Sequence, residues 1–87
     1  MIISETQHMS QMKRQREAAG MTQAQLAALT GINIRMIQHY EQGQKNLDGA
    51  HLNTLLRLCL ALHCPLAALI TDKETLSLIG RYNEQRT

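Results

Sequence analysis

The chain has 87 residues, of which 44% are hydrophobic, 18% are charged and only 2% are aromatic, and its formal net charge is +2. This length provides for one small domain, and a single Pro and the absence of Val, Trp and Phe disfavour a β-sheet core. No stretch approaches the ~20 apolar residues of a transmembrane helix, and residues 1–5 do not resemble a signal peptide. We therefore expect an all-α cytoplasmic protein without a membrane partner, with Cys59 and Cys64 reduced.

The charge is distributed unevenly along the chain. Residues 10–46 have a net charge of +3, from Lys13, Arg14, Arg16, Arg35 and Lys45 against Glu17 and Glu41. Residues 47–87 have four basic and four acidic residues and are neutral overall. The positive excess in the first half is a mild indication of a polyanionic partner.

Residues 4–19 are predicted to form the first helix, with Ser4 as N-cap, Gln7 at the capping-box position and Gly20 as the end. Arg16 falls on the apolar stripe of this helix, where its head could reach out to water or pair with an acid. Lys13 and Arg14 have two open interpretations, a solvated surface or contacts with phosphate.

Residues 21–43 are predicted to form two short helices joined by a glycine turn. Thr22 and Asn33 are suitable N-caps, and Gln25 completes a capping box with Thr22. Gly31 and Gly43 stand where each helix would end in a left-handed conformation. In the first of these helices we expect Leu26, Ala27 and Leu29 to face the core and Gln23, Ala24 and Ala28 to face outward.

The second of these helices is the candidate reader of a nucleic acid. Ile37 and Tyr40 should point inward, which leaves Ile34, Arg35, Gln38, His39 and Gln42 on the outside. An outward Ile beside an outward Arg suits the DNA major groove, where Ile can touch a thymine methyl and Arg can bind guanine O6 and N7. His39 could equally be an ordinary surface histidine. The polar turn that follows, residues 44–46, could grip a duplex backbone or be a plain loop.

A set of residues at fixed spacing resembles the Cro/repressor-type (XRE-like) helix-turn-helix family over about residues 9–70: Thr22, Gln23, Leu26, Ala27, Gly31, Ile32, Ile37, Tyr40, Glu41 and Gly43. The resemblance implies a compact, lambda repressor-like bundle of about five short helices that binds double-stranded DNA. It also implies an ion pair between Arg16 and Glu41. The resemblance supports base contacts by Ile34, Arg35, Gln38 and His39, and phosphate contacts by Thr22, Gln23, Gln42, Gln44, Lys45 and Asn46.

A further helix is expected over residues 50–62, capped by Asp48. Its core stripe is predicted to comprise Leu52, Leu55, Leu56, Cys59 and Leu62, widened by Leu58 and Leu60. Members of the family that the chain resembles usually carry a charged residue at the position of Leu60, so we expect either the tail or another subunit to cover it.

A short fifth helix is predicted from Pro65, with Leu66, Leu69 and Ile70 closing the core. Cys59, His63 and Cys64 offer too few ligands, without a paired C-x-x-C motif, for a metal site. Nothing resembles an oriented nucleophile, base and oxyanion site. We therefore expect no metal, no cofactor and no enzymatic activity.

Residues 71–87 form an extension beyond the expected DNA-binding domain of residues 4–70. Leu76, Ile79 and Tyr82 have helical spacing, although Gly80 weakens the helix and residues 83–87 should fray. The extension could be a sixth helix, a dimer arm or a loose tail, and with Leu60 these three residues are the dimer candidates.

Two functions follow from the resemblance. The first is a homodimeric repressor or autoregulator on an inverted repeat. The alternative is an antitoxin-like protein that binds a partner toxin and autoregulates through its DNA-binding domain. A third possibility, an interaction module without DNA binding, is disfavoured by the expected exposure of Gln23 and Arg35.

Overall fold

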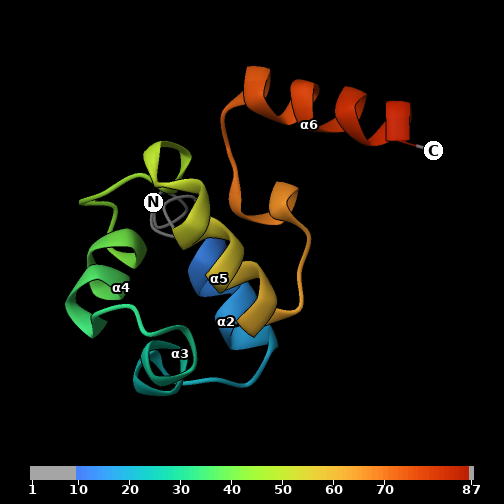
Figure 1. The fold of residues 1–87 in the computed structure, drawn as a ribbon. Coiled ribbons are helices and arrows are strands. Elements are labelled where there is room, and N and C mark those ends of the chain that lie inside the picture. The colour runs from blue at the N-terminus through green and yellow to red at the C-terminus, as the bar shows by residue number, and fades with distance from the viewer. Residues whose placement is uncertain (1–9, 87) are drawn as a thin grey trace, which may run out of the picture.

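The computed structural model describes residues 10–86, and no strand occurs in this part of the chain. Five α-helices and two short 3₁₀ helices follow one another (Figure 1): α2 Gln11–Ala18, α3 Gln23–Thr30, α4 Ile34–Glu41, η1 Leu47–Gly49, α5 Leu52–Leu62, η2 Leu66–Leu69 and α6 Lys73–Arg86. The predicted all-α bundle is confirmed. None of the helices described is long and apolar enough to span a bilayer.

The first described helix begins later than the sequence predicts. Ser10 has an extended backbone, and its side chain accepts a hydrogen bond from the backbone N–H of Lys13 at 3.0 Å. Because an extended N-cap interrupts helical hydrogen bonding, the single helix predicted over residues 4–19 is wrong, and α2 begins at Gln11. The predicted cap formed by Ser4 and Gln7 lies outside the described residues.

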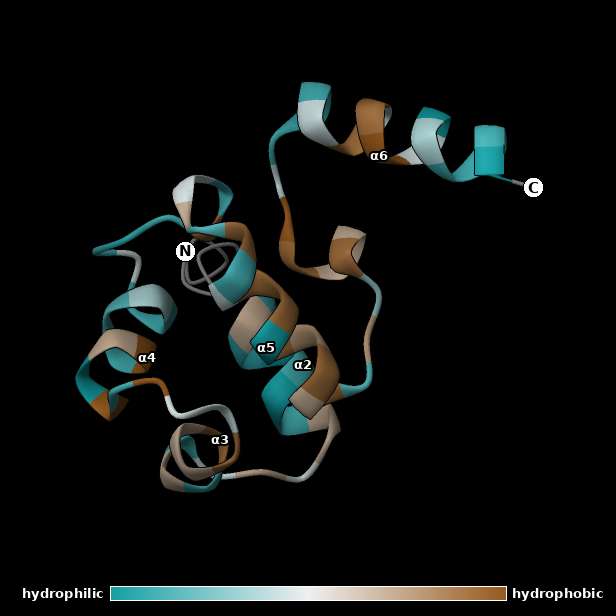
Figure 2. Cartoon of the chain, viewed as in Figure 1, coloured by the Kyte–Doolittle hydropathy of each residue, from teal (hydrophilic) through white to brown (hydrophobic). Residues whose placement is uncertain are grey.

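One fully buried side chain from each of five elements forms the centre of the core: Met12 from α2, Leu26 from α3, Ile37 from α4, Leu58 from α5 and Leu69 from η2. Each such side chain contributes roughly 1.5–3 kcal/mol when it is removed from water. Figure 2 shows hydrophobic residues along α5 and η2, which pack against each other, with α3 on α5 and α2 on η2. The core therefore fixes α3 and α4 relative to the rest of the domain.

Two predicted helix faces are wrong in part. Leu52 and Leu56 are 59% and 45% exposed, whereas Leu58 is fully buried. The α5 helix begins only at Leu52, after an extended residue, and its buried positions are Leu55, Leu58, Cys59 and Leu62. Leu55, Cys59 and Leu62 are therefore buried as predicted, whereas Leu58 takes the place of Leu52 and Leu56 in the core stripe.

Leu29 was predicted to face the core, and this prediction is also wrong, because Leu29 is 65% exposed. Thr30 takes the buried position one turn after Leu26. Its hydroxyl donates to the Leu26 carbonyl at 2.8 Å and accepts from the Ile32 N–H at 3.1 Å. These bonds satisfy the hydrogen-bonding groups of the Thr30 hydroxyl inside the core. Because Thr30 occupies the core position, Leu29 is left at the surface.

Asp48 does not cap the helix that follows it. It lies in η1, and its carboxylate accepts hydrogen bonds from the backbone N–H and hydroxyl of Thr71, at 2.8 and 2.7 Å. The α5 helix instead begins after His51, which makes no side-chain cap bond. Asp48 therefore fastens the loop before α5 to the start of the C-terminal extension.

The segment after α5 is shorter and tighter than predicted. His63 ends α5 in the left-handed conformation, with φ 54°. Pro65 then lies at the N-cap of η2, not inside the helix, and η2 is a 3₁₀ helix where an α-helix was expected. Leu69 and Ile70 are buried and Leu66 is partly buried, so this segment closes the core as predicted.

The extension forms a helix from Lys73 to Arg86. The carboxylate of Asp72 accepts from the N–H and hydroxyl of Thr75, at 2.9 and 2.7 Å, and these bonds lower the pKa of Asp72. The α6 helix continues through Gly80 to Arg86, so the predicted fraying from residue 83 is wrong for these residues. No residue of α6 is fully buried, and its C-terminal half projects beyond the rest of the chain (Figure 1).

Candidate nucleic-acid interface

Local hydrogen bonds fix the start of α3 and of α4. Thr22 and Gln25 form the predicted capping box, with bonds of 3.0 Å from the Gln25 N–H and 2.8 Å from the Thr22 N–H. Gly31 then has a φ of +75°, which glycine adopts without steric cost. Asn33 accepts from the Arg35 N–H at 2.7 Å and caps α4. These predictions for the caps and for Gly31 are confirmed.

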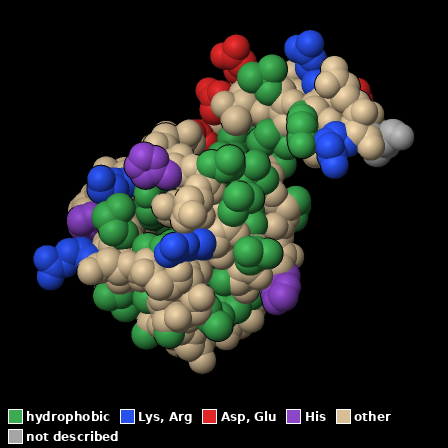
Figure 3. All heavy atoms as spheres, in the orientation of Figure 1, with side chains coloured by type: hydrophobic (Ala, Val, Ile, Leu, Met, Phe, Trp, Pro, Cys, Tyr) green, Lys and Arg blue, Asp and Glu red, His purple; other side chains and the backbone are tan. Residues whose placement is uncertain are grey.

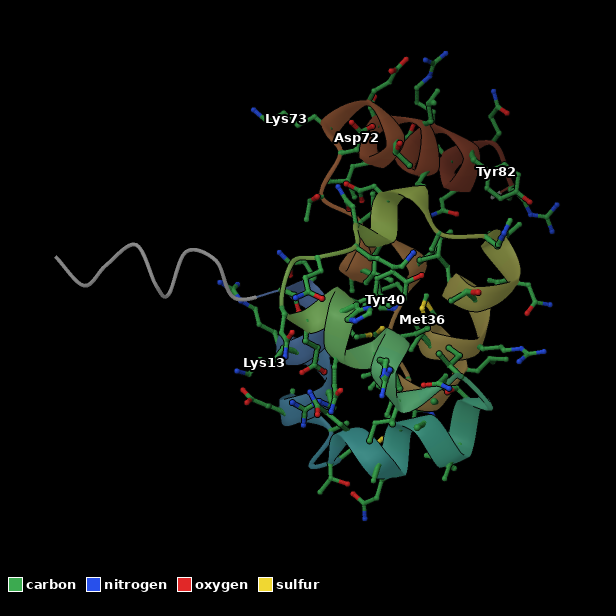
Figure 4. The ribbon with its side chains drawn as sticks, turned by 90° about the vertical axis from the view of Figure 1, so that its left-hand side faces the viewer. Lys13, Met36, Tyr40, Asp72, Lys73 and Tyr82 are labelled. Carbon is green, nitrogen blue, oxygen red and sulfur yellow. The ribbon has the colours of Figure 1, made fainter. Side chains whose placement is uncertain are left out.

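One face of α4 is anchored in the protein. Ile37 is fully buried and Tyr40 is 8% exposed. Met36 is partly buried against the same core. Figure 4 looks onto the α4 side of the molecule and shows the Tyr40 and Met36 side chains inside it. The opposite face of the helix must therefore point to solvent.

The predicted base-reading residues lie on that outer face. Ile34 is 40% exposed, Arg35 is exposed, and Gln38 and His39 are partly exposed. The guanidinium of Arg35 makes no hydrogen bond or ion pair with any residue between 10 and 86, so its five N–H donors are available. The structure thus brings all four residues together on an accessible helix at the edge of the molecule (Figure 1).

A buried ion pair joins α2 to α4. Arg16 Nε lies 2.6 Å from Glu41 Oε2, and Arg16 Nη2 donates to Glu41 Oε1 at 3.0 Å. The side chains are only 11% and 3% exposed. Hydrogen bonding to Glu41 raises the pKa of Arg16. Arg16 Nη1 also donates to the Met21 carbonyl at 2.8 Å, so one guanidinium holds α2, the link to α3, and α4 together.

Gln23 takes part in this cluster, which the sequence does not predict. Its Nε2 donates to Glu41 Oε1 at 3.0 Å, and its Oε1 accepts from Gln38 Nε2 at 3.5 Å. Gln23 and Glu41 are 18 residues apart, so no local spacing signals their contact. A chain of side chains therefore leads from Arg16 to Gln38 on the outer face of α4.

The predicted phosphate-contacting residues surround α4. Thr22, Gln42, Gln44, Lys45 and Asn46 are exposed, and Gln23 is partly exposed. The oxygen atoms of Thr22 and Asn46 already serve as caps, the latter for the Asp48 N–H at 2.9 Å. The Lys45 ammonium has no partner among residues 10–86. The loop is held by its backbone, because the Gln44 and Lys45 N–H groups both donate to the His39 carbonyl.

The charge of this surface is of one sign. Glu41 is the only acidic residue between positions 22 and 46, and its side chain is buried and paired. The exposed charges of this segment are therefore those of Arg35 and Lys45. Figure 3 shows Lys and Arg side chains at the edge of the molecule that carries α4. Such a surface attracts a polyanion.

The two cysteine thiols are in the protonated, weakly nucleophilic form. Cys59 and Cys64 are free, and burial raises the pKa of Cys59 to about 11 and also raises the pKa of Cys64. Both groups are therefore neutral near pH 7, when a nucleophile would need the thiolate. Within residues 10–86, no group of three or more His, Cys, Asp or Glu side chains could hold a metal ion.

The chain matches a known protein family over most of its length. The family described as "Helix-turn-helix" matches residues 12–69, which covers most of the chain from α2 through η2. The matched segment includes both helices of the candidate interface and ends before α6. Comparisons with curated proteins and with solved structures give no significant match.

Proposed function

The chain belongs to the Cro/repressor-type helix-turn-helix family of DNA-binding regulators, and on this premise we propose that it represses transcription as a homodimer on a short inverted repeat. Autoregulation of its own promoter is the simplest form of this activity. Repression is proposed because occupation of a promoter needs nothing beyond the DNA-binding domain. The residues that carry sequence recognition are those of the outer face of α4.

The observation that supports this proposal best is the free guanidinium of Arg35 beside the exposed Ile34. An α-helix fits the major groove, which is about 12 Å wide. There Arg35 would donate two hydrogen bonds to guanine and Ile34 would contact a thymine methyl. Gln38, whose amide N–H donates to Gln23, would present its amide to adenine, and His39 extends the same face by one residue.

The remaining predicted residues would position the helix. We assign phosphate contacts to a set that flanks α4 on both sides: Thr22, Gln23, Gln42, Gln44, Lys45 and Asn46. The N-terminus of α3 adds free backbone N–H groups and the positive end of its dipole. Of this set only Lys45 carries a charge, so its contact would provide the largest salt-dependent contribution.

Two copies are proposed because one such module reads only a few base pairs. In a dimer, the two α4 helices would enter successive major grooves about 34 Å apart. The half-sites of the operator would then be related by the same two-fold symmetry as the protein.

Selection of bound duplexes from a random pool tests this function. We expect enrichment of a two-fold symmetric motif. Arg35→Ala should then lose about 1–3 kcal/mol of preference for that motif while keeping salt-dependent binding to random duplex. Lys73→Ala, which removes one charge from α6, is the matched control and should bind as the wild type does. Equal loss on both duplexes would assign Arg35 to phosphate, and a pool without enrichment would contradict sequence-specific binding.

An antitoxin-like function is a second candidate, and one apolar surface favours it. Leu29 and Leu60 are 65% and 77% exposed and line one hollow of about 320 Å³ with Arg57 and Ala61. The described part of the extension does not cover Leu60, contrary to one of the two alternatives drawn from the sequence. Coexpression with the product of an adjoining gene tests this function. A complex lost in Leu60→Lys, with DNA binding retained, would support it, and no complex would oppose it.

A further inference from the structure

The α6 helix presents an apolar seam that its own domain leaves uncovered. Leu78 is 51% exposed and Tyr82 is 60% exposed, whereas Leu76 and Ile79 pack against the core. Thr75, Leu78 and Tyr82 are spaced by three and then four residues, as in the seam between two paired helices. Figure 2 shows the hydrophobic residues of α6 in its middle, between hydrophilic ends.

We propose that α6 pairs in antiparallel orientation with α6 of a second copy, with the two-fold axis passing near Leu78. This pairing would provide the interface for the homodimer and in that respect rests on the proposed function. The apolar seam of each α6 is therefore covered by the same seam of the partner subunit.

Charge complementarity argues for this occupant and this orientation. Glu74 and Arg81 are seven residues apart, so they lie on the same flank of the seam on either side of Leu78. Seven residues of helix span ~10.5 Å, which is too far for an ion pair within one helix. In an antiparallel pair centred on Leu78, Glu74 of each copy would face Arg81 of the partner subunit. In a parallel pair this flank would face the other flank of the partner helix, where Arg81 would lie opposite a second Arg, residue 86, and Glu74 would meet no basic residue.

The charges along the whole of α6 follow the same order as Glu74 and Arg81, acidic at the beginning and basic at the end. Asp72, Lys73 and Glu74 give its beginning a net charge of −1, and Arg81, Glu84 and Arg86 give its end +1. Figure 3 shows acidic side chains at the start of α6 and basic side chains farther along it. Antiparallel pairing brings these opposite ends together.

The shape of the surface also fits a second copy. A hollow of about 430 Å³ lies between η2 and α6, lined by Pro65, Leu66, Thr75, Leu78, Ile79 and Tyr82. The C-terminal half of α6 projects beyond its own domain (Figure 1). Around an axis at Leu78, the projecting half of each helix would lie along the first half of the other and cover the partner's hollow.

Charge exchange tests this pairing, with the mass measured by sedimentation equilibrium in the absence of DNA. The wild type should sediment as a dimer of the 9.8 kDa chain. Glu74→Arg and Arg81→Glu should each weaken the dimer by roughly tenfold, because two attractive contacts become repulsive. The double variant Glu74→Arg/Arg81→Glu should regain wild-type dimerisation. Since these residues cannot meet within one helix, only contact between copies explains such a rescue.

The control is Lys73→Glu, which changes the charge as Arg81→Glu does but lies on the face of α6 turned away from the seam, and it should keep the dimer. Circular dichroism shows whether each variant keeps its helices. If a charge variant fails to fold, Leu78→Ser replaces it and should be monomeric. A monomeric wild type, single variants that dimerise normally, or a double variant without rescue would each overturn the pairing. DNA binding is measured separately by the pool selection, so failure of the α6 pairing and failure of sequence-specific DNA binding can be told apart.

Discussion

Glu41 is the residue on which three segments of the domain converge. Its carboxylate accepts from Arg16 on α2 and from Gln23 on α3 while its backbone belongs to α4. A buried carboxylate is tolerated only with such partners, because its desolvation costs more than one weak contact returns. The cluster therefore sets the position of α4 relative to α3, which the reading of a groove requires.

Removal of either member of the ion pair should destabilise the domain. Arg16→Ala or Glu41→Ala leaves a buried charge unpaired, so the free energy of unfolding should fall by ~3–5 kcal/mol in urea titrations. The double variant Arg16→Met/Glu41→Leu should lose less than either single variant, because no charge remains buried. Lys13→Ala on the same helix is the control, with a change within about 0.5 kcal/mol. Single variants as stable as this control would show that the pair is not needed.

Cys59 should make the stability of the domain depend on pH in the alkaline range. Its pKa is raised to about 11 by burial, from an ordinary value of 9.0. Below pH 9 the thiol is protonated in both states, but between pH 9 and 11 only the unfolded chain loses the proton, so stability falls as pH rises. The urea midpoint of the wild type should exceed that of Cys59→Ala at pH 8, and this difference should be smaller at pH 10.5. A constant difference between the two proteins would contradict the burial of this thiol.

At the scale of elements, glycines in helix interiors and at helix ends should respond oppositely to the same substitution. A Cβ at Gly80 or at Gly43 would meet no atom within 4 Å, but Gly43 has a φ of +81° whereas Gly80 lies within α6. Gly80→Ala should therefore raise stability by about 0.5–1 kcal/mol, and Gly43→Ala should lower it by at least as much. Thermal unfolding of both variants checks this, and a change of the same sign in both would refute it.

The helices and caps of the candidate interface were predictable because their signals are local. Thr22 with Gln25, Gly31, and Asn33 each act on a neighbouring turn, so spacing alone identifies them. The start of α2 and the full membership of the α5 core stripe could not be predicted, because other N-caps and other apolar residues were equally plausible from the sequence. Both Ser4 and Ser10 are suitable N-caps, and both Leu56 and Leu58 are suitable members of the core stripe.

Contacts between distant elements could not be predicted from the sequence, for a different reason. The Arg16–Glu41 pair was expected only through the family resemblance. The bond between Gln23 and Glu41 had no such guide, and neither had the bonds from Thr71 to Asp48. Polar contacts of this kind depend on how helices pack, which periodicity does not specify.

At the scale of the whole molecule, two surfaces of different character lie on different helices. The α4 face carries unpaired positive charge, and the α6 seam carries exposed apolar residues with charges of both signs. The match to the family covers the first surface and ends before the second. The boundary predicted between residues 70 and 71 therefore separates a proposed DNA-binding unit from a proposed pairing helix, which are joined through Thr71 and Asp48.

Salt dependence should report how the whole molecule meets DNA. Each cation on a phosphate contributes about −0.9 to the slope of log K against log salt concentration. Lys45→Ala should reduce the magnitude of that slope by about one per copy and weaken binding equally on selected and random duplexes. An unchanged slope would remove Lys45 from the phosphate contacts, with Lys73→Ala as the control that should leave it unchanged.

The most direct measurement is an NMR titration of ¹⁵N-labelled protein with the duplex obtained by pool selection. We predict the largest amide shift changes at the start of α4 and through Gln38 and His39, smaller ones at Thr22–Gln23 and in residues 44–46, and none on binding in the second half of α6. Shift changes confined to α6 or α5, with α4 unaffected, would contradict the claim that α4 enters the groove.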